Sequence, residues 1–147
     1  MGYNPNFRGK RGTATLRSES DLLNNTGATI NSLNLVYVNV SGNIAVVDAS
    51  DETKALNIIG ISKVSILNGD TGTVVHSGRI EGITTLTGFG DTVYVSKTGE
   101  LTNIKPSIGV NSFTIGDFVI KIGVIAKNEL NPAEKDLIVN IEIEGQL

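Results

Sequence analysis

The chain has 147 residues and a formal net charge of −3, and its length suits one domain or two small ones. It contains no cysteine and one histidine, which excludes disulfide scaffolds and thiolate metal sites and leaves few groups for an enzyme. Its 17 glycines, together with frequent Val and Ile, favour strands and tight turns over helices. No apolar run approaches the length of a membrane span, and residues 1–20 lack the apolar segment of a secretory signal.

Residues 1–20 predict an extended basic arm, because Gly and Pro interrupt them and neither a strand nor a helix period is visible. Four of the chain's 12 basic residues and none of its 15 acidic residues fall within residues 1–17. Residues 18–147 therefore carry 8 basic and 15 acidic residues, a net charge of −7, so the arm precedes an acidic body. The candidate partner-binding side chains of the arm are Tyr3, Phe7, Arg8, Lys10, Arg11 and Arg17.

Two kinds of partner suit such an arm. Its four cations could contact nucleic-acid phosphates, but few contacts are available and the acidic body opposes them. Tyr3 and Phe7 could instead anchor in pockets of an acidic protein partner, so that the arm becomes ordered on contact. We favour the protein partner over an arm that stays disordered, and nucleic acid is the least favoured of the three.

From about Ile30 onward, short β-branched runs alternate with turn residues. The strand candidates are Asn34–Val40, Ile58–Ile61, Thr73–Ile80, Asp91–Ser96, Phe118–Ile125 and Leu137–Ile143. Asp48–Ala55 is the one segment expected to form a helical turn. Many short strands with frequent turns predict an all-β sandwich or barrel, with residues 21–147 as one β domain behind the flexible arm.

An internal repeat is the most informative feature of the body. The segment Leu35–Ile44 matches Thr92–Leu101 with an offset of 57, which pairs the two Val-Tyr-Val runs. Further along, Ile59-Gly60-Ile61 matches Ile122-Gly123-Val124 with an offset of 63. The change of six residues predicts one insertion, within residues 105–116 of the second copy. The domain is therefore expected to contain two duplicated β units, repeat one at about 30–83 and repeat two at about 88–147.

Each repeat predicts a short strand, a glycine turn and a second strand. Gly in the Ile-Gly-Ile run permits close approach of another backbone. One unit alone exposes hydrophobic strand edges. We therefore expect the two copies to cover each other about a pseudo-twofold axis.

Four groups of residues were considered as chemical sites. On the expected strand the neighbouring Ser77 points away from His76, so a catalytic pair would need a hydroxyl and an orienting acid from elsewhere, which favours a partly buried or interfacial histidine. Asp48, Asp51 and Glu52 lack the glycine and the distal Glu of a calcium loop, so solvated acids at a helix start are favoured. Gly88-Phe89-Gly90 precedes a strand, which indicates a turn and not a phosphate-binding loop. Glu81 and Glu144 are equivalent acids, and solvated strand-end acids are favoured over a catalytic pair. The expectation is no catalytic residue, no metal and no cofactor.

At the repeated residues a resemblance to a known family emerges. The run Gly90–Thr102, followed by Ile122-Gly123-Val124-Ile125, resembles the β-rich modules of tailed-bacteriophage virion proteins, among them capsid decoration (cement) and head-fibre proteins. The first copy departs from the run, since it has Leu33-Asn34-Leu35 where the second has Gly90-Asp91-Thr92. No functional residues come with the resemblance.

This resemblance implies a non-enzymatic structural component of a bacteriophage particle. It implies a homo-oligomer, often a trimer, located in the virion after assembly in the host cytoplasm. The arm would then dock onto major capsid or other virion proteins. Two alternatives remain open: a tail-fibre or baseplate adaptor or receptor-binding module, and, as the poorest fit, a small hydrolase.

Overall fold

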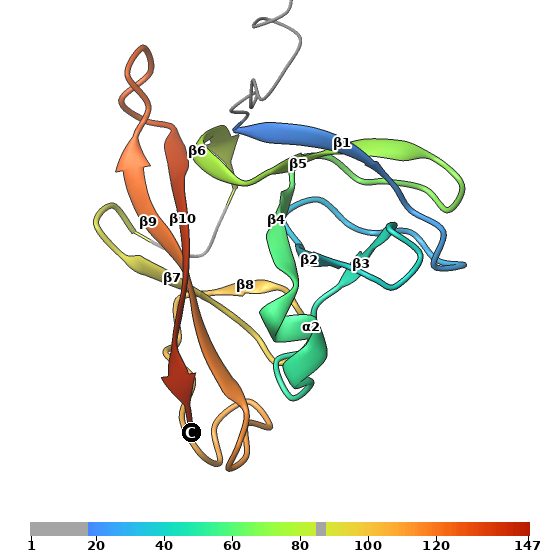
Figure 1. Ribbon diagram of the computed structural model, residues 1–147. Helices are drawn as coiled ribbons and strands as arrows, with labels where there is room; N and C mark the ends of the chain where they lie inside the picture. Colours follow the sequence, from blue (N-terminus) through green and yellow to red (C-terminus); the bar gives the residue numbers. More distant parts are fainter. Residues whose placement is uncertain (1–17, 85–87) are drawn as a thin grey trace, which may run out of the picture.

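The computed structural model describes residues 18–84 and 88–147 of the chain (Figure 1). The arm residues 1–17, with Tyr3, Phe7, Arg8, Lys10, Arg11 and Arg17, lie outside the described residues. Glu19 and Ser20, expected to end the arm, are instead the first residues of a strand. The expected all-β class is confirmed, because the described residues form two five-stranded antiparallel sheets and one short helix.

The first sheet is built from the N-terminal half of the chain. In the order in which they lie, its strands are β1 (Glu19–Leu23), β5 (Thr71–Val75), β4 (Ile58–Ser62), β2 (Leu35–Val38) and β3 (Ile44–Val46). The helix α2 (Glu52–Leu56) connects β3 to β4. Asp51 starts this helix by accepting a hydrogen bond from the Lys54 backbone N–H at 3.2 Å. We call residues 18–75 unit one.

The second sheet is built from the C-terminal half. In spatial order, its strands are β6 (Ser77–Ile83), β10 (Lys135–Gln146), β9 (Phe118–Lys127), β7 (Thr92–Val95) and β8 (Leu101–Thr102). The hairpin of β9 and β10 contributes the two longest strands of this sheet, which lies on the left of Figure 1. We call residues 77–147 unit two.

The two units are structural duplicates. Adding five to each strand number of sheet one gives the strand order of sheet two. In unit one Leu35 pairs with Ile61 and Val36 with Gly60, and a bulge follows Val36. In unit two Thr92 pairs with Val124 and Val93 with Gly123, and a bulge follows Val93. The offsets of these partners are 57 and 63, the values found in the sequence.

One strand assignment from the sequence is wrong. Thr73–Ile80 was expected to form a single strand, but the chain leaves sheet one after Val75 and enters sheet two at Ser77. His76 lies at the crossover between the sheets. The sequence does not reveal this break, because β5 and β6 are both strands and no turn residue separates them. They differ only in the strands with which they pair.

Each sheet has two faces, and they are covered differently. We call the face that carries Val36 in unit one, and Val93 in unit two, the inner face; the opposite face is the outer face. The inner face of unit one packs beneath Ile30 and Ile66, which form a small separate core with it. These two residues exchange backbone hydrogen bonds of 2.9 and 2.8 Å. We call Ile30 and Ile66 the plug.

The main core lies between the units. It joins the outer face of unit one, with Leu35, Ile61 and Val75, to the inner face of unit two, with Val93 and Leu137. Backbone hydrogen bonds also cross the junction: the Leu35 N–H donates to the Gly99 carbonyl, and the Phe118 N–H donates to the Ala49 carbonyl. The units are thus stacked in the same sense, outer face to inner face.

The expected pseudo-twofold pairing is therefore wrong. A twofold axis would bring equivalent residues of the two units together. Instead Ile61 lies in the core between the units, whereas its equivalent Val124 lies on the open side of sheet two and is 36% exposed. The sequence indicated that each unit needed covering, but it carried no signal for which faces would meet.

Candidate functional site at the junction of the two units

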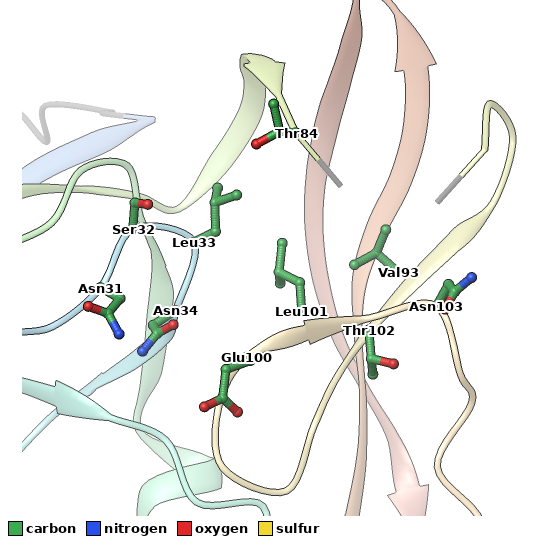
Figure 2. Close-up of a pocket in the computed structure, with 10 residues that line it drawn as sticks. All are labelled: Asn31, Ser32, Leu33, Asn34, Thr84, Val93, Glu100, Leu101, Thr102 and Asn103. Carbon is green, nitrogen blue, oxygen red and sulfur yellow. The ribbon is translucent and has the colours of Figure 1, made fainter. Parts of the chain in front are cut away.

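The candidate site is a pocket of about 570 Å³ at the junction of the units (Figure 2). Unit one contributes the loop before β2, and unit two contributes the end of β6 and the β7–β8 hairpin. Its lining residues are Asn31, Ser32, Leu33, Asn34, Thr84, Val93, Glu100, Leu101, Thr102 and Asn103. Most of the exposed lining surface is apolar, with amide and hydroxyl groups and one carboxylate around it, which suits a ligand that has both apolar and hydrogen-bonding groups, such as an extended peptide.

The loop that forms one wall is held by Ser62. This serine is fully buried, and its hydroxyl donates to the Asn31 carbonyl at 2.6 Å and accepts from the Asn34 N–H at 3.0 Å. Between these contacts Leu33 has a φ of 63°, in the left-handed region that a Leu residue rarely adopts. The Leu33 N–H donates to the Ser62 carbonyl at 2.7 Å. The wall is therefore a fixed and strained part of the fold.

Glu100 is the acid on the other wall, and its carboxylate is already engaged. The Ser96 hydroxyl donates to it at 2.6 Å and the Thr98 hydroxyl at 2.5 Å. These hydrogen bonds hold the pKa of Glu100 below its ordinary value and outweigh the opposing effect of partial burial. A general acid at neutral pH needs a raised pKa, so Glu100 is not suited to that role.

His76 lies outside this pocket. One ring nitrogen, Nδ1, is 2.6 Å from the Ile59 carbonyl, and Nε2 is 2.8 Å from the Ser20 hydroxyl. The ring thereby ties β1 and β4 to the crossover between the sheets, and it is half-buried. With both nitrogens engaged, this geometry agrees with the favoured interpretation of a structural histidine.

The other residues considered from sequence are not brought together. Asp48 accepts from the Ser50 hydroxyl at 2.6 Å, Asp51 caps α2, and Glu144 lies 3.8 Å from Lys105. Within residues 18–84 and 88–147, no three acidic or histidine side chains form a group that could hold a metal ion. In the same part of the chain, α2 is too short to cross a membrane and no other helix has the length and apolar character to do so.

The sequence did not reveal the junction pocket. Its walls come from segments about 60 residues apart, and Asn, Ser and Thr in loops are as typical of turns as of binding sites. The strained φ of Leu33 left no trace in sequence, since a Leu between the polar residues Ser32 and Asn34 is ordinary in an alternating strand or a loop.

Comparisons of the chain with protein-family models, with curated proteins and with solved structures find no match in any of the three. The candidate site is therefore interpreted from its own geometry.

Proposed function

We propose that the chain is a non-enzymatic structural component of a bacteriophage particle, of the capsid decoration or head-fibre type, that docks through its N-terminal arm. The resemblance of Gly90–Thr102 to phage virion modules motivates this proposal. The duplicated β body supports it, because stacked units around a continuous core suit a rigid element that coats or projects from a particle.

The observation that carries the docking role is where the arm joins the body. The Ser18 carbonyl accepts hydrogen bonds from the His76 and Ser77 N–H groups, so the chain enters the fold at the crossover between the sheets. In Figure 1 this point lies at the end of the molecule opposite the C-terminus. An arm that starts there can bind a virion protein while the C-terminal end of the body points away.

The first test is co-purification with particles. Virus particles from the organism that encodes the chain are purified on a density gradient and analysed by mass spectrometry. The expected result is that the chain is present as a repeated component. Particles that lack the chain would overturn the proposal.

The second test separates the arm from the body. The full chain and a chain that starts at Ser18 are incubated with the particles and sedimented. Only the full chain should sediment with them. The pair Tyr3→Ala and Phe7→Ala should weaken binding more than Arg8→Ala and Lys10→Ala, since the aromatic side chains are the proposed anchors. Equal binding of the truncated chain would contradict docking through the arm.

A tail-fibre or baseplate adaptor with a receptor-binding role is the second candidate. The junction pocket favours it, because amides such as Asn31 and Asn103 beside an aliphatic floor could bind a sugar. A glycan array probed with the protein and with Asn103→Ala tests this candidate. Binding of a glycan that the variant loses would move the assignment from decoration to receptor recognition.

A further inference from the structure

The open outer face of unit two differs from its counterpart in unit one. In unit one Leu35 and Ile61 are fully buried and Val75 is 4% exposed, because unit two covers them. The equivalent residues Thr92, Val124 and Ile138 form one row across β7, β9 and β10. Within the described part of the chain no residue packs on this row to include it in a core, and Val124 is 36% exposed.

The residue types of this row are those of a covered face. The solvated side of an antiparallel sheet usually alternates to polar residues. Here the two central positions are Val124 and Ile138, which conserve the aliphatic character of Ile61 and Val75 through the duplication. Next to them, Lys121 pairs in register with Glu142, so the face carries both charge signs around its apolar centre. A surface of this kind can be complementary to itself.

A second copy cannot cover this face by repeating the contact that joins the two units. That contact would require the inner face of unit one, which the plug residues Ile30 and Ile66 already occupy. A face that carries aliphatic residues and both charge signs can instead pair with the same face of another copy about a twofold axis. We propose that the outer face of unit two, centred on Val124 and Ile138, is the interface of a twofold-symmetric dimer of this chain.

The test compares two Val→Lys variants by light scattering on a sizing column over a range of concentrations. Val124→Lys places a charge at the centre of the proposed interface. Val40→Lys is the matched control, because Val40 lies in the β2–β3 turn and is fully exposed. The unchanged protein and Val40→Lys should have twice the 15.5 kDa chain mass. Val124→Lys should raise the protein concentration at which half of the dimer is dissociated by at least tenfold.

Crosslinking keeps the proposal testable if Val124→Lys impairs folding. The chain contains no cysteine, so Val124→Cys introduces a single reactive thiol. A twofold axis near this position brings the two thiols within reach of a short bis-maleimide, and a covalent dimer is expected. Val40→Cys should give little covalent dimer at the same concentration.

Three outcomes would overturn the proposal. One is a monomer at all concentrations, and another is a trimer, which a twofold interface cannot build. The third is a dimer that survives Val124→Lys but is lost in the chain that starts at Ser18, which would assign the contact to the arm. None of these results depends on whether the chain is found in virus particles, so this proposal and the proposed function can fail separately.

Discussion

At the residue scale, the buried carboxylate of Asp136 is held by a group of hydrogen-bond donors. This side chain is fully buried, and it accepts hydrogen bonds from the Gly82 N–H at 2.9 Å, from Arg79 at 2.8 Å and from the Asn128 amide. Burial alone would raise the pKa of Asp136. The three donors outweigh this effect and hold its pKa below the ordinary value of 3.8. The contact fastens the edge strand β6 to the β9–β10 hairpin.

Because the pKa of Asp136 is lowered in the folded state, its stabilising contribution is present above pH 3.8 and is lost as the pH falls through the folded pKa. We predict that Asp136→Asn lowers the free energy of unfolding at pH 7. The difference from the unchanged protein should shrink steadily below about pH 4. Chemical denaturation at several pH values measures both, with Glu52→Gln, an exposed acid of α2, as the control. A difference that stays constant down to pH 2 would contradict the assignment.

Some residue-scale contacts were predictable and others were not. Gly60 and Gly123 were expected where another backbone approaches, and this is confirmed: a Cβ on either would collide with the carbonyl of Val75 or Ile138. The contact of Arg79 with Asp136 joins residues 57 positions apart. No local pattern encodes such a pair, since each residue alone reads as a solvated charge on a strand.

At the scale of elements, the plug is the part that lets unit one complete a core of its own. Ile30 is 1% exposed and lies in a loop, not in one of the strands. Replacing Ile30 by Ala removes buried methyl groups above Val36 and leaves a cavity. The expected loss is about 2–5 kcal/mol in the free energy of unfolding, measured in urea. Ile108→Ala, at an exposed position in the β8–β9 connection, should stay within about 0.5 kcal/mol.

If Ile30→Ala proved as mild as Ile108→Ala, the plug would not contribute to the stability of unit one, and the inner face of that unit would have to be stable without cover.

The strands were predictable where they contain runs of β-branched residues, as in β2 and β7, which lie entirely within their predicted ranges. The predicted ranges cover residues 118–125 of β9 and residues 137–143 of β10, and Asp48–Ala55 overlaps α2. In contrast, β3 and β8 have three and two residues, too few for a period to be visible. The sequence predicts no strand at β1, because its residues, Glu-Ser-Asp-Leu-Leu, include no β-branched side chain. Its strand conformation comes from pairing with β5.

At the scale of the whole molecule, the duplication allows equivalent positions of the two units to be compared within one chain. Ile61 and Val124 are equivalent positions, one between the units and one on the open outer face. We predict that Ile61→Ala costs about 2–5 kcal/mol in the free energy of unfolding, whereas Val124→Ala costs less than about 1 kcal/mol in the monomer. Urea unfolding measures both losses at a protein concentration low enough for the dimer to be dissociated. Similar losses at the two positions would mean that the outer faces of the two units are equally covered.

The sequence predicted the number of units, and the register shows the same two offsets, but the assembly of the units was not predictable. The insertion was placed at residues 105–116, and the β8–β9 connection there replaces α2. What a single sequence lacks is a signal for which sheet face meets which, because both faces of unit one are aliphatic. The junction pocket follows from that assembly, so it could not be inferred either.

The plug also determines the order in which the chain can reach its final state during synthesis. Unit one leaves the ribosome first and can fold on its inner face at once, since Ile30 and Ile66 precede its last strand. In unit two the described residues of the inner face lie in the core that they share with the outer face of unit one. Until unit two has been synthesised and has folded, Leu35, Ile61 and Val75 remain an uncovered apolar surface. A chain that ends after β5 should therefore be prone to aggregation.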